Sequence, residues 1–107
     1  MSKNSVEEIQ SEEDFKSLIK MGVTVIDFFA EWCGPCRLLT PLIQTVAEEL
    51  SGKVTFAKLD IEKLHVIAKE LHVTSVPTLI LFKDGEEKNR LVGLRDQQVI
   101  KEFALSV

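Results

Sequence analysis

The chain contains two cysteines, Cys33 and Cys36, which lie three positions apart. Two sulfurs at this spacing in the first turn of a helix lie on the same side and close enough to bond. A structural disulfide stabilises more as the loop that it closes lengthens, and this loop is minimal. Such a pair also supplies two of the four ligands of a zinc site. The pair therefore indicates reversible dithiol–disulfide chemistry, with a structural staple and half of a metal site as alternatives.

The residues that follow the pair favour a reactive thiolate at Cys33. Apolar residues recur there at helical spacing and predict a helix that Cys33 opens: Leu38, Leu39, Leu42, Ile43, Val46, Ala47 and Leu50. The unpaired N–H groups and the positive dipole end of a helix N-terminus stabilise a thiolate. We therefore expect Cys33 to be the nucleophile, and Cys36, one turn further in, to be less accessible.

The other residues of this segment suit contact with a partner. Pro35 fits the first helical turn, where its missing N–H costs nothing, and it stiffens the segment between the sulfurs. Gly34 has no side chain that would screen the site. Trp32 offers a flat apolar contact to an incoming peptide, with packing in the core as an equally weighted alternative.

Hydrophobic periodicity places the elements that position this segment. β-branched and aromatic residues predict three buried strands, over Val23–Ala30, Val54–Leu59 and Thr78–Phe82. Helical patterns lie before, between and after them, over residues 11–19 with Ser11 as N-cap, 37–50, 61–71 and 99–104. Lys83-Asp84-Gly85 is typical of a hairpin turn before an edge strand over Lys88–Val92, and Val6–Ile9 could form a short first strand.

This order of elements predicts an α/β fold. Strands separated by helices are expected to pair in parallel through right-handed crossovers, and the final hairpin to add an antiparallel strand. We expect a central mixed sheet of four to five strands with helices on both faces, in one domain over residues 1–107. Ligands meet such sheets beyond the carboxyl ends of parallel strands, and Cys33 lies just past the strand Val23–Ala30.

Composition excludes several classes of partner and location. The formal net charge is −4 and no Lys/Arg cluster is present, so we expect no nucleic-acid and no membrane partner. The longest apolar stretch, Val25–Ala30, is too short to span a bilayer. The segment MSKNSVEEIQSEEDF lacks the apolar core of a secretion signal and is too acidic for a transit peptide, which could, however, have been removed already. We expect a cytoplasmic monomer, with a processed organellar form left open.

A larger pattern surrounds the cysteines. The segment Trp32-Cys33-Gly34-Pro35-Cys36 is identical to the active-site motif of the thioredoxin family. Matching segments continue in the same order: Asp27-Phe28-Phe29-Ala30-Glu31, Pro41, Lys58-Leu59-Asp60, Val76-Pro77-Thr78, Phe82-Lys83-Asp84-Gly85 and Gly93. The resemblance implies the thioredoxin fold and a dithiol–disulfide oxidoreductase that reduces disulfides in partner proteins.

The resemblance also implies how the cysteines are recycled. After Cys33 attacks and Cys36 resolves the mixed disulfide, a thioredoxin reductase fed by NADPH would reduce the redox-active disulfide Cys33–Cys36. We expect no bound cofactor and no metal. The five glycines form no nucleotide-binding fingerprint.

Asp27 interrupts an apolar run that is expected to be buried. A buried carboxylate without a partner has a raised pKa, and the alternative is an aspartate at a strand end in water. In the family, the matching acid lies behind the second cysteine and accepts and donates its proton. Lys58 matches the lysine that pairs with this acid, and an exposed strand lysine is its alternative.

Pro77 is expected at the start of a central strand, because proline is poorly tolerated inside a sheet. The family has a cis proline here, facing the two sulfurs, although residue type alone favours trans. The resemblance implies that the backbone of Val76 pairs with substrate peptide and that Gly93 keeps the docking surface flat. The expected substrate-binding patch around Cys33 comprises Trp32, Gly34, Pro35, Val76, Pro77 and Gly93.

The chain departs from the family at two positions near this site. Phe29 stands where the family often has tryptophan, and Leu71 stands where an aromatic residue is common. Both suggest modest changes in packing or redox tuning, and neither removes a catalytic group.

Several alternative functions stay open. A disulfide oxidase or isomerase usually has a different residue pair between the cysteines, commonly with a histidine, and an exported context; a glutaredoxin also carries a different pair. A zinc site needs four ligands, and the spacing of His65 and His72 is unlike that of zinc fingers. A non-catalytic binding module would keep the fold for protein contacts, but the intact cysteines disfavour it.

Overall fold

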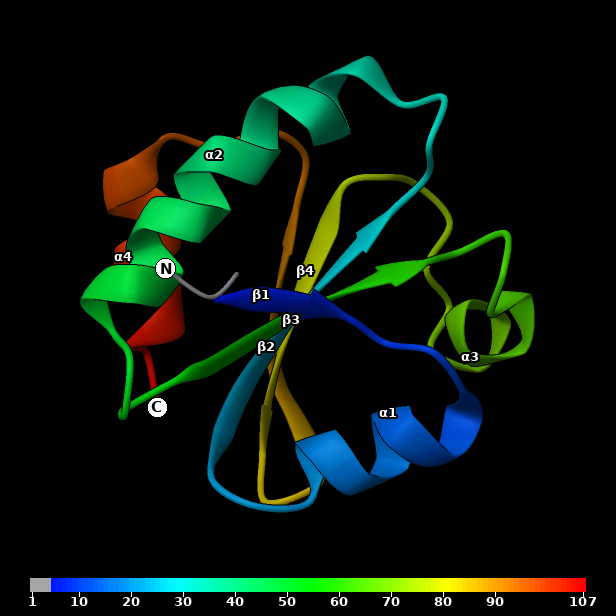
Figure 1. The fold of residues 1–107 in the computed structure, drawn as a ribbon, viewed down its shortest axis with the longest axis horizontal. Helices are drawn as coiled ribbons and strands as arrows, with labels where there is room; N and C mark the ends of the chain where they lie inside the picture. The colour runs from blue at the N-terminus through cyan, green and yellow to red at the C-terminus, as the bar shows by residue number, and fades with distance from the viewer. Residues whose placement is uncertain (1–4) are drawn as a thin grey trace.

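The computed structural model describes residues 5–107 of the chain, which contain five strands and four helices (Figure 1). The strands are β1 (Val6–Glu8), β2 (Val23–Phe29), β3 (Thr55–Asp60), β4 (Thr78–Lys83) and β5 (Glu86–Val92). The helices are α1 (Glu12–Ile19), α2 (Gly34–Glu49), α3 (His65–Glu70) and α4 (Gln97–Ala104). Each predicted element is present, although α3 is shorter than expected. Residues 1–4 of the expected domain lie outside the described residues.

The strands form one mixed sheet of five strands, as predicted, and their order in the sheet is β1-β3-β2-β4-β5. β1, β3 and β2 run parallel to one another. β4 is antiparallel to β2, and β5 is antiparallel to β4. The prediction that all strands separated by helices pair in parallel was therefore wrong for β4.

The reversal of β4 follows from the length of α3. Asp60 Oδ1 accepts the N–H groups of Glu62 at 2.9 Å and of Lys63 at 3.4 Å, and the resulting turn delays the start of the helix. A helix of six residues spans about 9 Å, whereas a strand of six residues spans about 20 Å. α3 is thus too short to return the chain along the sheet, and β4 starts at the edge where β2 and β3 end.

Helices cover both faces of the sheet, with α2 and α4 on one side and α1 and α3 on the other (Figure 1). Val25 packs in the cluster that α2 and α4 share, whereas Ile26 and Phe28 pack in the cluster with Phe15 of α1. Side chains alternate along a strand, so Asp27 faces the same side as Val25, toward α2. No helix within the described residues is both long and apolar enough to cross a membrane.

Side-chain and turn contacts fix the ends of several elements. Ser11 caps α1 as predicted, because its side chain accepts the N–H of Asp14 at 3.1 Å. The hairpin between β4 and β5 is also confirmed, with positive φ at Asp84 (50°) and Gly85 (91°). The side chain of Asp84 accepts the N–H of Gly22 at 2.9 Å and so ties this hairpin to the loop after α1.

We predict that Ile100→Ala lowers the free energy of unfolding by about 2–5 kcal/mol, because it leaves a cavity under α4. Ile100 is 0% exposed and packs with α2 against the sheet. Leu105→Ala is the control, since Leu105 is 49% exposed, and it should change stability by roughly 0.5 kcal/mol. Urea unfolding curves measure both values; equal losses in the two variants would contradict this assignment of the core.

Candidate active site

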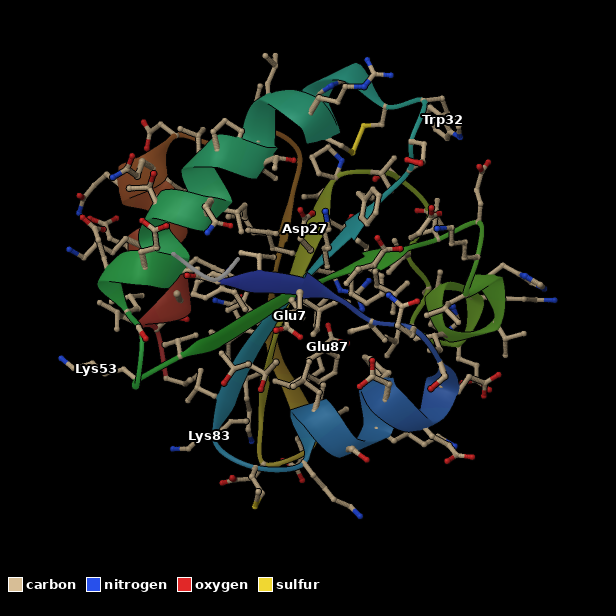
Figure 2. All side chains as sticks on the ribbon, viewed as in Figure 1. Glu7, Asp27, Trp32, Lys53, Lys83 and Glu87 are labelled. Atoms are coloured by element: carbon tan, nitrogen blue, oxygen red, sulfur yellow. A yellow bond between two sulfur atoms is a disulfide. The ribbon has the colours of Figure 1, made fainter. Side chains whose placement is uncertain are left out.

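Cys33 and Cys36 lie at the start of α2, which confirms the predicted helix start. Cys33 is the N-cap residue, with extended backbone, and its Sγ accepts the N–H of Cys36 at 3.1 Å. The N–H of Cys33 donates to the carbonyl of Ala30 at 3.1 Å, so the chain turns directly from the end of β2 into α2. The two sulfurs are bonded to each other, and Figure 2 shows this disulfide as a yellow bond.

The two sulfurs differ in their neighbours rather than in their exposure. Cys33 is 4% exposed and Cys36 is 3% exposed, so the expected difference in accessibility is absent in the disulfide form. The sulfur of Cys33 accepts a hydrogen bond from a backbone N–H at the helix N-terminus, and this bond favours a thiolate. Cys36 instead shares a cleft with Asp27 and Lys58.

Asp27 lies in the middle of β2, beneath α2 (Figure 2). The residue is 5% exposed, and its Oδ1 has no hydrogen-bond partner among the described residues. Burial raises the pKa of Asp27 to about 7, while the positive charge of Lys58 opposes this rise. The interpretation as a buried acid is confirmed, and the alternative of an aspartate in water is wrong.

A cleft of about 230 Å³ runs from Asp27 past Cys36, between α2 and β3. Lys58 lies beside Asp27 in the register of the parallel strands β2 and β3. It is half-buried, and its Nζ lies 5.6 Å from the centre of the Phe29 ring. Lys58 is thus part of the wall of this cleft and not a fully exposed strand lysine.

Trp32 stands at the surface near the disulfide (Figure 2). It is 64% exposed, and its Nε1 donates to Glu62 Oε2 at 2.9 Å. The alternative of Trp32 as a core residue is therefore wrong. Gly34 and Pro35 are also exposed, in the first turn of α2.

The other residues of the expected patch lie just before β4 and just after β5, at the same edge of the sheet. Val76 packs against the small cluster that contains both cysteines. The Val76–Pro77 bond is cis, as the resemblance implied, and β4 begins at the next residue. The N–H of Gly93, just after β5, donates to the carbonyl of Pro77 at 2.8 Å. The structure therefore brings the predicted substrate-binding residues together at one end of the sheet.

Sequence reasoning missed three residues at this site. Ile61 packs against the cluster that contains the cysteines, and Glu62 accepts the hydrogen bond from Trp32. Thr40 lines the cleft with Asp27. Only Thr40 could have been predicted from the sequence, because it follows Cys36 by one turn of the expected helix. Ile61 and Glu62 lie in the turn after β3, and no sequence pattern places this turn at the site.

The two histidines lie away from the cysteines. His65 and His72 line a separate cleft beside α3, together with Lys69. Within residues 5–107, no group of three or more His, Cys, Asp or Glu side chains is arranged to hold a metal ion.

The fold and the site define a class of protein. A bonded Cys-X-X-Cys pair at a helix N-terminus, at the edge of this mixed sheet, is the site of a dithiol–disulfide oxidoreductase. The family model Thioredoxin matches residues 6–106, and the chain belongs to the thioredoxin family.

Individual relatives agree in sequence and in fold. A thioredoxin from Chlamydia pneumoniae is 50% identical over 92 residues, which cover 86% of this chain and 89% of the relative. The structure of a mutant thioredoxin from Halobacterium salinarum superposes with a TM-score of 0.87 at 32% identity, covering 99% of this chain and 94% of that one. Mitochondrial thioredoxin 3 from Saccharomyces cerevisiae, in its oxidised form, also gives 0.87 at 32% identity, covering 96% of each chain.

The raised pKa of Asp27 predicts a pH-dependent stability. The folded protein holds a proton on Asp27 up to about pH 7, whereas an ordinary aspartate loses it near pH 3.8, so stability falls as pH rises between these values. We therefore expect Asp27→Asn to gain stability relative to the original chain by roughly 2–4 kcal/mol between pH 4 and pH 8.

Urea unfolding of the oxidised proteins across this pH range measures the difference. Glu7→Gln is the control for removal of a carboxylate, because Glu7 is exposed on the edge strand β1, and it should stay within roughly 0.5 kcal/mol of the original chain. A constant difference between Asp27→Asn and the original chain from pH 4 to pH 8 would contradict the burial of an ionisable Asp27.

Proposed function

We propose that this oxidoreductase reduces disulfides in partner proteins, with Cys33 as the attacking residue and Cys36 as the resolving residue. The observation that carries this assignment is the hydrogen bond from the Cys36 N–H to the sulfur of Cys33 at the N-terminus of α2. An amide donor and a helix dipole favour negative charge on that sulfur. The side chain of Cys36, the second residue of the pair, instead shares a cleft with an acid.

The reaction then proceeds in two exchanges. The thiolate of Cys33 attacks one sulfur of the partner's disulfide, a mixed disulfide forms, and the partner's other sulfur leaves as a thiolate that takes up a proton. Cys36 loses its proton to Asp27, and its thiolate attacks the sulfur of Cys33. The Cys33–Cys36 disulfide forms, and the partner's remaining sulfur leaves as a thiolate. Two electrons pass from this protein to its partner.

Asp27 is the proton acceptor and donor for Cys36 in this scheme, and Lys58 adjusts it. A group with a pKa of about 7 can exchange protons in either direction near neutral pH. The positive charge of Lys58, from the neighbouring strand, favours the carboxylate form that accepts a proton. The cleft that holds Asp27, Cys36 and Lys58 supports this joint role.

The partner docks on the patch around Cys33. Trp32 offers an exposed flat surface, and a Cβ at Gly34 would meet nothing within 4 Å, so this glycine serves access to the sulfurs. The backbone of Val76 pairs with an extended partner segment, as a strand added to a sheet does. Pro35, Pro77 and Gly93 complete the patch.

Turnover requires an outside reductant. Family membership supports a thioredoxin reductase in this role, with NADPH as its electron source. In this proposal the chain works as a monomeric single domain in the cytoplasm, without a bound cofactor. The reduction potential tests the direction of electron flow: a reducing value supports this function, and a strongly oxidising value would instead favour a disulfide oxidase.

A trapping experiment tests the division of roles between the cysteines. In Cys36→Ser, the mixed disulfide on Cys33 has no resolving thiol, so covalent complexes with disulfide proteins should accumulate. Gels without reductant detect these complexes, and dithiothreitol should release them. Cys33→Ser is the matched control, since it keeps one thiol of the same pair and should trap nothing. Equal trapping by the two variants would contradict the assignment.

A further inference from the structure

Asp27 needs a route by which its proton reaches solvent. Its Oδ1 is buried and has no hydrogen-bond partner among the described residues. Each resolving step would leave a proton on Asp27, which must depart before the next cycle. A partner that covers Cys33 also covers the surface around Trp32 and Gly93, so the route has to open elsewhere.

Asp27 lines two cavities. The larger, about 230 Å³, passes Cys36, and the smaller, about 30 Å³, lies against Ile43 further along α2. Both are lined by Asp27, Thr40 and Lys58. Neither is lined by Trp32, Pro77 or Gly93, which belong to the proposed docking patch.

Thr40 is exposed to solvent and shares both cavities with the buried acid. It is an exposed residue of α2, one helical turn beyond Cys36, yet it lines both cavities. Its hydroxyl donates to the carbonyl of Cys36 at 3.0 Å. The proton of the hydroxyl is therefore engaged, while its oxygen keeps free acceptor capacity. A polar acceptor at this position can receive a hydrogen bond from water or from a protonated carboxyl group.

We propose that Thr40 is a positioning residue for proton exchange between Asp27 and solvent. Its hydroxyl provides a polar group in the two cavities, here called the passage, through which the proton leaves while a partner covers Cys33. The inference rests on the proposed role of Asp27 in the resolving step. In this inference, the partner reaches the site at the docking patch, whereas the proton leaves along α2.

Other groups also surround Asp27. On β4 the residue opposite Asp27 is the apolar Leu79, which neither titrates nor accepts a proton. On α2 the smaller cavity adds the neutral amide of Gln44. The titratable or charged groups that share the larger cleft with Asp27 are Cys36 in its reduced form, Lys58, Glu31 and Arg37.

The chain offers a matched control for the hydroxyl. Thr45 lies on the same helix, is exposed, and donates to the carbonyl of Pro41 at 3.0 Å in the same geometry as Thr40. Thr45 lines neither cavity. Thr40→Val and Thr45→Val thus each remove a hydroxyl that is bonded in the same way on the same helix. Thr40→Ser keeps a hydroxyl beside the two cavities and removes only the methyl group.

Two measurements are made on the full chain across pH. Carbon-13 NMR of the Asp27 carboxyl group follows its titration in the oxidised protein, and rapid mixing follows release of a peptide thiol from a preformed mixed disulfide on Cys33. For Thr40→Val we expect the Asp27 titration to move to higher pH. Release of the peptide thiol at pH 7 should slow about two- to tenfold, because one hydrogen-bonding group is lost. Release should recover at pH 9, where Asp27 is ionised again.

Thr45→Val and Thr40→Ser should match the original chain in both measurements. If Thr40→Val also matches the original chain, or slows release equally at every pH, Thr40 has no part in proton exchange and the inference is overturned. Asp27→Asn distinguishes a failure of the inference about Thr40 from a failure of the proposed role of Asp27. Slow release by Asp27→Asn beside a normal Thr40→Val removes only the role of Thr40, whereas normal release by Asp27→Asn removes the proposed role of Asp27 as well.

Discussion

The hydrogen bond from the Cys36 N–H to the sulfur of Cys33 ties the chemistry of this protein to its fold. The first N–H groups of any helix lack partners within the helix and need an acceptor from the residue that precedes it. In most helices a serine or aspartate oxygen fills this place, and here a sulfur does. Pro35 removes one further donor from the same turn. The sulfur that caps α2 is therefore also the sulfur for which we propose the attacking role.

The sheet beneath α2 imposes a second constraint, which acts on Cys36. Alternation along β2 directs Asp27 toward α2, beside a cluster of buried apolar residues. An ionised carboxylate is costly there, so its pKa rises toward neutrality and stability at neutral pH is lost. A surface aspartate would not lower the stability, but at neutral pH it would be fully ionised and only a weak base. Asp27 thus lowers stability at neutral pH, and it supplies there a carboxyl group that can take up a proton, the role that we propose for it.

Features with a local pattern could be predicted from the sequence. The apolar stripe after Cys36 placed the cysteines at a helix start, and the break in an apolar run marked Asp27 as a buried acid. The direction of β4 could not be predicted, because it depends on a side-chain turn at Asp60 that shortens α3. The position of Trp32 was left open for a similar reason, since its partner Glu62 lies 30 positions away along the chain. The cis bond before Pro77 was expected from the family resemblance alone.

The order in which the two thiols of the reduced protein react tests the separate roles of Cys33 and Cys36 most directly. Brief alkylation with iodoacetamide over a range of pH, with mass spectrometry to locate the label, measures the thiolate fraction at each cysteine. We expect Cys33 to be labelled first, with a midpoint below the value of about 8.5 for free cysteine, while Cys36 stays unlabelled. Labelling of Cys36 first, or of both thiols with the midpoint of free cysteine, would contradict these roles.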